Sequence, residues 1–373
     1  MYIYLLLYIL LIVPLLNYKV DKKIIILSSL IFIFLINFLR DPSASTDFHN
    51  YIGAIEGEKL YLKNYDPTFG FIIDLLKDVF GFNSYITYQI ICFIPFACIF
   101  LSAFILNSYL IIPIYLSSET FVLLSFNAIR QGLAIGFLTL ASAVFIKEII
   151  ESKKNKTAPY IKVIGISFIS FLVHKSSIII FIFFLINIVI NRFIKILLSQ
   201  RINVKTILFF IFGLLFFLLF SFFQGNILNS LFLKILSVQD LLNVNNLLQT
   251  GLGYGKSHLN SIYRFTIMYL IYFYVLINLK KFGLSEEKNK DLKYFLSSIN
   301  FSFIPLIIIL IFLPGFILSR FSHYYLIPIF GMFYFLNKHL DSRNTILCKI
   351  ITVIGLITYS SNSVISNLFS IPN

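Results

Sequence analysis

Long apolar runs rich in Ile, Leu and Phe recur along this chain and constrain its fold more than any other feature. Hydrophobic residues make up 59% of the 373 residues and charged residues only 12%, with a mean hydropathy of +0.91. This composition excludes a soluble domain, because such a domain needs far less apolar surface. Inside a bilayer, helices satisfy their own backbone polar groups. The sequence therefore predicts an all-α polytopic membrane protein.

About twelve segments approach the roughly 20 apolar residues that one spanning helix needs. They are 2–17, 23–39, 85–106, 109–124, 127–147, 159–173, 176–191, 206–223, 262–279, 294–313, 317–336 and 346–365. The segments 109–124, 159–173 and 176–191 are short enough to be tilted, half-buried or re-entrant. The first segment lacks a basic region and a small-residue cleavage site, so we interpret it as a retained span.

Basic residues collect in loops that this span prediction places on one side of the membrane, as Lys22, Lys154 and Lys288 illustrate. The positive-inside rule makes that side cytoplasmic. Both termini and two long segments, 40–84 and 224–261, then lie outside. We expect a single membrane-embedded domain over residues 1–373, with these segments as its outer loops.

The two outer loops differ in character. The apolar residues of the first loop recur at helical spacing over 69–82, which predicts an amphipathic helix lying on the membrane. These residues are Phe69, Ile72, Ile73, Leu76, Val79 and Phe80. The second loop is polar and contains Gly251-Leu252-Gly253-Tyr254-Gly255. We interpret this run as flexible or lid-like, because no strand precedes it as a phosphate-binding fingerprint requires.

Several arginines fall at the outer ends of predicted spans, where the positive-inside rule disfavours them. They are Arg40, Arg130, Arg264 and Arg320. A guanidinium matches phosphate oxygens bidentately, and a helix N-terminus adds positive charge. We therefore predict an anionic headgroup such as a lipid diphosphate at this face. The alternative for each arginine is snorkelling to lipid phosphate.

His174 and Lys175 interrupt an apolar stretch between two predicted spans. The break places an imidazole and an ammonium at the outer junction of a helical hairpin. These groups are suited to act as an acid, a base or a diphosphate donor within a cavity. The alternative is a turn whose polar residues reach the interface.

Asp47 and Asp66 are the outer carboxylates best placed to accept a proton from a sugar hydroxyl. Their alternative roles are to cap loop helices or to pair with Arg40, Lys59 or Lys63. Cys92, Cys98 and Cys348 lie in apolar segments without metal-ligand spacing, so we expect buried thiols. The net charge of +14 does not by itself imply a nucleic-acid partner.

Five short motifs carry a resemblance to a known family. They are Thr46-Asp47-Phe48 with Tyr51, Asp66-Pro67-Thr68-Phe69-Gly70, Ile129-Arg130-Gln131-Gly132-Leu133-Ala134, Phe171-Leu172-Val173-His174-Lys175-Ser176-Ser177, and Arg320-Phe321-Ser322-His323-Tyr324-Tyr325. Together they resemble the EpsG-like branch of the Wzy-type polysaccharide polymerases over residues 40–330. The arginine-glutamine and histidine motifs are the most specific. The chain departs from the family pattern at Ser45, where Gly is frequent, and at Asp66, where Glu is common.

The resemblance implies a membrane glycosyltransferase that joins oligosaccharide repeat units carried on undecaprenyl diphosphate. It would work at the outer face of the bacterial cytoplasmic membrane, with one lipid-linked chain as donor and a second as acceptor. The product would be O-antigen, capsule or exopolysaccharide. A chain-length regulator and a flippase are the protein partners that such a pathway would supply.

The resemblance also suggests roles for individual residues. Arg130 and Arg320 would bind the diphosphate, which gains negative charge in the transition state. His174 would be a base or a diphosphate donor, and Asp47 would position the acceptor or act as the base. Further substrate-binding residues would be Arg40, Asp66, Gln131, Lys175, Arg264 and His323. Because no DxD-like motif lies among the outer residues, the arginines would replace a metal, and we expect no cofactor.

Two other activities fit the same residues. A flippase of lipid-linked oligosaccharide could use these arginines to bind diphosphate, but it must expose its site to both sides and commonly shows internal repeats. We find no convincing repeat, and the informative charges lie on one face. A ligase that transfers finished glycan would use the same chemistry with a different acceptor.

Overall fold

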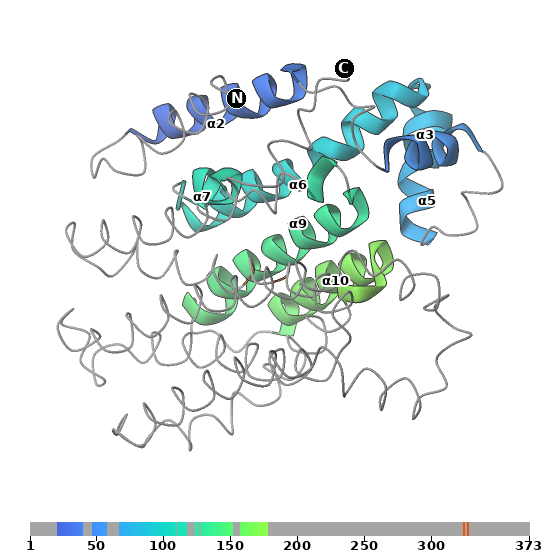
Figure 1. Cartoon of the computed structure of the whole chain (residues 1–373). Coiled ribbons are helices and arrows are strands. Elements are labelled where there is room, and N and C mark those ends of the chain that lie inside the picture. The colour runs from blue at the N-terminus through green and yellow to red at the C-terminus, as the bar shows by residue number, and fades with distance from the viewer. Residues whose placement is uncertain are drawn as a thin grey trace, which may run out of the picture.

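The computed structural model describes residues 21–39, 47–57, 67–109, 111–117, 124–126, 128–151 and 157–177, together with Tyr324 and Ile327. Every regular element within these ranges is helical (Figure 1). Two helices there, Ser84–Leu106 and Ile129–Glu148, are long and apolar enough to cross a membrane. The 224–261 loop and several predicted spans lie wholly or largely outside the described residues, so the predicted number of spans stays a prediction. These spans are 2–17, 176–191, 206–223, 262–279, 294–313, 317–336 and 346–365.

The predicted spans that fall within the described residues correspond closely to observed helices. Residues 23–39 form α2 (Lys22–Leu39), and 85–106 form α6 (Ser84–Leu106). The predicted span 127–147 contains α9 (Ile129–Val144), which continues as the π-helix η3 (Phe145–Glu151). Residues 159–173 form α10 (Thr157–Val173). Apolar length alone was therefore enough to locate these four helices.

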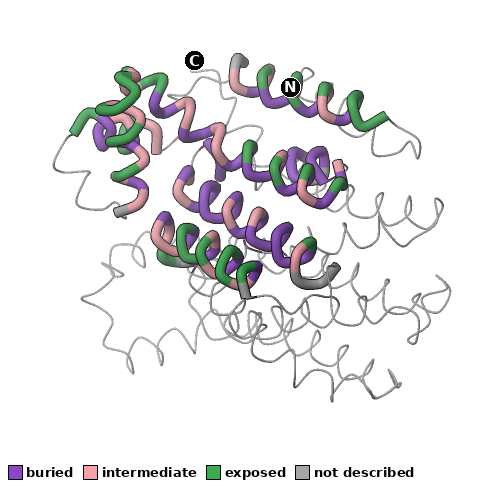
Figure 2. Tube along the Cα trace, turned by 180° about the vertical axis from the view of Figure 1, so that it is seen from behind, coloured by how far each residue is buried: buried purple, intermediate pink, exposed green. Residues whose placement is uncertain are grey.

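Helix α9 is the centre of the described part, with α6 on one side and α10 on the other (Figure 1). Almost every residue of α9 is buried or half-buried (Figure 2). A Cβ on Gly136 would lie 3.0 Å from the Cα of Pro95 and 3.2 Å from the Cβ of Cys98. The glycine therefore allows α6 and α9 to cross at close range, as small residues do between membrane helices.

Two buried polar contacts join α9 to its other neighbours. The Ser170 hydroxyl of α10 donates a hydrogen bond to the Ala134 carbonyl at 3.0 Å. The hydroxyls of Tyr115 and Thr139 lie 2.9 Å apart, which joins α7 (Ile111–Ser117) to α9. Helix α7 is shorter than the predicted 109–124 span, and residues 118–123 lie outside the described residues.

The outward faces of the peripheral helices are strongly apolar. Ile24, Leu27 and Phe34 of α2 are 55%, 60% and 66% exposed, and Ile161 of α10 is 69% exposed. Figure 2 shows exposed residues repeating along both helices, opposite their buried faces. In water such surfaces would be costly, whereas lipid solvates them. The apolar helices and their exposed faces indicate a membrane protein.

The predicted amphipathic segment 69–82 is helical, but its apolar face differs from the prediction. It forms α5 (Pro67–Asp74) and the π-helix η2 (Leu75–Val79). Phe69 and Ile73 are buried, whereas Val79 and Phe80 are exposed. The prediction assumed one α-helical period throughout. The change to π-helix at Leu75 rotates the later residues away from the buried face, which lies against α10 and α3 (Phe48–Glu56).

Candidate functional site

Arg130 lies in the first turn of α9, nearer the helix start than the predicted span 127–147 would place it. The helix begins at Ile129, so Arg130 is its second residue and not a full turn inside it. Ala128 precedes the helix without a side-chain cap, and its carbonyl accepts hydrogen bonds from the amides of Gln131 at 2.9 Å and Gly132 at 3.1 Å. The positive end of the helix dipole therefore adds to the charge of the guanidinium.

The chain just before α9 is held firmly against it. A Cβ on Gly132 would lie 2.8 Å from the carbonyl oxygen of Leu124, so only glycine admits this backbone. Phe126 is fully buried, and its carbonyl accepts a hydrogen bond from the Tyr88 hydroxyl of α6 at 3.1 Å. These contacts fix the position at which α9 begins, and with it the base of the Arg130 side chain.

Helix α3 (Phe48–Glu56), from the first predicted outer loop, brings Asp47 and Tyr51 to this end of α9. The Phe48 ring packs edge-on against Tyr88 with ring centroids 5.0 Å apart. Tyr51 is only 5% exposed, and its amide donates a hydrogen bond to the Asp47 carbonyl at 3.0 Å. Asp47 occupies the N-cap position, yet its side chain makes no capping hydrogen bond. The alternative role of Asp47 as a helix cap is therefore wrong.

Burial and two neighbouring charged groups shift the pKa of the Tyr51 hydroxyl. Burial raises the pKa of the Tyr51 hydroxyl above its ordinary value, and the negative charge of Asp47 raises it further. The positive charge of Arg130 and hydrogen bonds from its backbone and side chain act in the opposite direction. The net rise in pKa keeps Tyr51 a neutral phenol at physiological pH, between a carboxylate and a guanidinium.

His174 ends α10 at the same level as Arg130. The two helices are antiparallel, and the hydrogen bond from Ser170 to Ala134 marks one level across them. Arg130 lies one turn before Ala134, and His174 lies one turn after Ser170. The amide of His174 makes the last hydrogen bond of this helix, to the Ser170 carbonyl, and its Nε2 atom is buried. The predicted helix break at His174 is confirmed.

Lys175 begins a short 3-10 turn, η4 (Lys175–Ser177), which contacts α9 and leaves the Lys175 side chain exposed. Gln131, beside Arg130, is 5% exposed. The described residues thus bring Asp47, Arg130, Gln131, His174 and Lys175 to one end of the α9–α10 pair, which we call the Arg130 end. An end that combines a guanidinium, a helix N-terminus and an imidazole can bind a polyanion and move a proton.

The chain matches the family model of the EpsG family over residues 23–371. It belongs to the EpsG family. No curated protein and no solved structure matches it. Membership of the EpsG family indicates a membrane protein with a polysaccharide-polymerase-like, glycosyltransferase-type role in polysaccharide biosynthesis.

The remaining predicted site residues of this EpsG-family chain lie outside the described residues. They are Arg40, Asp66, Arg264, Arg320 and His323. Tyr324, which follows His323 in the last of the five motifs, is described and fully buried. Within the described part no group of three or more His, Cys, Asp or Glu side chains could hold a metal ion. Cys92 and Cys98 are buried, as predicted, and Cys348 lies outside the described residues.

Sequence reasoning assigned no role to Tyr51 in this EpsG-family site. Tyr51 was noted only as part of the motif that begins at Thr46. Its spacing of four residues from Asp47 places both on one face of a helix, which was the available signal. Its contact with Arg130 joins segments far apart in the chain, so spacing could not reveal it.

Proposed function

We propose that this chain joins undecaprenyl-diphosphate-linked oligosaccharide repeat units, with the Arg130 end at the outer face of the bacterial cytoplasmic membrane. The observation that carries the proposal is the convergence of Arg130, Tyr51 and His174 at one end of α9 and α10. The orientation rests on the one-sided distribution of basic loops. The family supplies the class of reaction.

In the proposed reaction, a hydroxyl of the acceptor sugar attacks the anomeric carbon of the donor chain. The new glycosidic bond forms as the bond from that carbon to the diphosphate oxygen breaks. The hydroxyl proton passes to His174 or to Asp47, and the diphosphate leaves with its lipid and the bonding electron pair. Arg130 and the start of α9 stabilise the negative charge that develops on the leaving group.

Arg320 is proposed to share the diphosphate with Arg130, because both belong to the resemblance motifs. Arg40, Asp66, Gln131, Lys175, Arg264 and His323 are proposed to contact the lipid-linked substrates. In this scheme the cations do the work of a metal, so catalysis is metal-independent. The product class, whether O-antigen, capsule or exopolysaccharide, follows from the repeat unit that the cell provides.

The test uses cells whose chromosomal copy is deleted and replaced by a His174→Ala variant. Loss of polymerase activity should leave one exported repeat unit on the cell surface and abolish the long-chain ladder on a gel, because export does not require chain extension. His49→Ala is the matched control, since His49 is exposed on α3 in the same region. This control should keep the ladder.

Three results would contradict the proposal. Repeat units trapped inside His174→Ala cells, out of reach of externally added glycosidase, would support a flippase. Normal chain length with unattached polymer would support a ligase. A normal ladder from His174→Ala, at equal protein levels, would remove His174 from the reaction.

A further inference from the structure

We propose that Tyr51 is a positioning residue whose buried hydroxyl orients the Arg130 guanidinium toward the diphosphate. This inference rests on the proposed function, because it concerns how that same site binds its anion. It adds a second residue from the first predicted outer loop, after Asp47, to the site that α9 and α10 help to build. The first loop would then complete the site, and not merely cover it.

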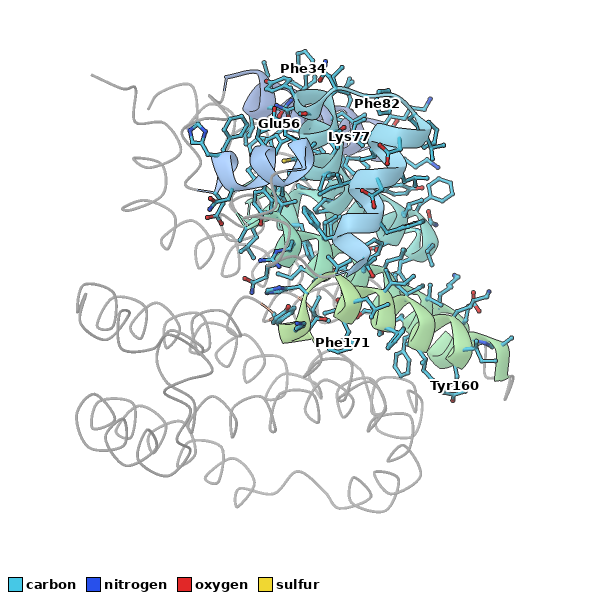
Figure 3. The ribbon with its side chains drawn as sticks, turned by 90° about the vertical axis from the view of Figure 1, so that its right-hand side faces the viewer. Phe34, Glu56, Lys77, Phe82, Tyr160 and Phe171 are labelled. Carbon is cyan, nitrogen blue, oxygen red and sulfur yellow. The ribbon has the colours of Figure 1, made fainter. Side chains whose placement is uncertain are left out.

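Contacts with neighbouring helices hold the Tyr51 ring in a fixed position, as orienting Arg130 requires. It packs against the fully buried Phe69 of α5 with ring centroids 5.7 Å apart. Lys77 of η2 donates a hydrogen bond to the Ile55 carbonyl at the end of α3, and Figure 3 shows Lys77 beside the end of α3 that carries Glu56. Helix α3 is therefore held both through the Tyr51 ring and at its C-terminus.

The N-terminal end of α3 is held by Tyr88, the same residue that helps to fix the start of α9. Phe48 packs against Tyr88, and Tyr88 donates its hydroxyl hydrogen bond to the carbonyl of Phe126, just before α9. Tyr51 and Arg130 are thus anchored to one common support on α6. A hydrogen bond between two groups on a common support restricts the guanidinium more than a contact from a free loop would.

The phenol has a specific advantage over a carboxylate at this position. When a carboxylate pairs with an arginine, its negative charge offsets the positive charge of the guanidinium. The pair therefore attracts a second anion less strongly. The Tyr51 hydroxyl is hydrogen-bonded to Arg130 and, as a neutral phenol, orients the planar fork without adding negative charge to that of Asp47. The fork can then bind phosphate oxygens bidentately. Desolvation of the Tyr51 hydroxyl keeps it neutral, as burial of an acidic group does.

The test compares two tyrosine-to-phenylalanine variants of the full-length purified protein in nanodiscs. Tyr51→Phe keeps the ring packing and removes only the hydroxyl. Tyr115→Phe also removes a buried hydroxyl bonded to a neighbouring helix, at Thr139, roughly two and a half turns along α9 from Arg130. The probe is undecaprenyl diphosphate, with undecaprenol as the uncharged control, and the dissociation constant is measured.

We expect Tyr51→Phe to weaken binding of undecaprenyl diphosphate about tenfold, the usual scale for one hydrogen bond to a charged group. Binding of undecaprenol should not change. Tyr115→Phe should bind both probes as the wild type does, although both variants lower the apparent melting temperature. Equal binding by Tyr51→Phe and Tyr115→Phe would show that Tyr51 is only structural and would overturn the inference.

A double-mutant cycle tests whether Tyr51 acts through Arg130. In an Arg130→Ala background, Tyr51→Phe should cause no further loss of diphosphate affinity. A full additional tenfold loss there would contradict positioning. If Arg130→Ala itself leaves affinity unchanged, the proposed diphosphate site fails as a whole. If Arg130→Ala weakens binding but Tyr51→Phe does not, only the inference about Tyr51 fails.

Discussion

Charged residues are held differently at the two ends of the α9–α10 pair. Opposite the Arg130 end, Lys162 of α10 donates hydrogen bonds to both carboxylate oxygens of Glu148 in η3, at 2.8 and 3.1 Å. The two side chains are 57% and 33% exposed. At the Arg130 end, the guanidinium instead lies beside the buried phenol of Tyr51.

We interpret this difference as one between a structural use of charge and the proposed functional one. An exposed ion pair such as Glu148 with Lys162 contributes no more than about 1 kcal/mol and satisfies both of its members. Arg130 instead contacts a buried phenol, with the Asp47 carboxylate also close to that phenol, in a site that several helices build. Such an arrangement is suited to a ligand that brings its own negative charge.

The largest expected effect concerns which side of the membrane each end faces. In a background without native cysteines, His49→Cys should be labelled from outside by an impermeant maleimide, because His49 is exposed on α3 near the Arg130 end. Lys162→Cys, which is exposed at the Glu148 end, should be labelled only after the membrane is opened. Labelling of Lys162→Cys in intact cells would reverse the orientation and remove the outward-facing site.

A second prediction exchanges the cations at the two ends. Arg130→Lys should lower polymer formation at least about tenfold, because an ammonium keeps the charge but loses the bidentate fork. The reciprocal change Lys162→Arg should leave the polymer ladder intact, since Glu148 can pair with either cation. Ladder length and membrane protein levels are measured together. A normal ladder from Arg130→Lys would return Arg130 to the role of a snorkelling residue.

The smallest expected effect tests how precisely the start of α9 is placed. Gly132→Ala should destabilise the protein by about 1–3 kcal/mol, because the new Cβ meets backbone at Leu124 that cannot move aside freely. It should also reduce polymer length by shifting Arg130. Gly165→Ala on α10 is the matched control, since a Cβ there meets nothing within 4 Å.

Apparent melting temperatures of the two purified glycine variants give the measurement. Gly165→Ala should melt no lower than the wild type, because alanine favours a helix over glycine. Equal melting temperatures for both variants would show that the chain before α9 adjusts easily. The tight packing at Gly132 would then not explain how Arg130 is placed.

Several features follow from the sequence because their physical causes are local. Apolar runs of bilayer length become α2, α6, α9 and α10, since a spanning helix satisfies its backbone within itself. The polar pair at His174 and Lys175 ends α10 at Val173, as predicted. The motif around Arg130 likewise indicated the family before any fold was known. Each of these signals lies within one short stretch of chain.

Only the tertiary structure decided which groups meet. Periodicity could not tell which side of the 69–82 segment is buried, because a π-helical turn at Leu75 changes the period. Nor could it pair Tyr51 with Arg130, which are far apart in the sequence and meet through the packing of α3 on α6. The sequence determines helices through local hydrophobicity, whereas the site depends on contacts between helices, which no single stretch encodes.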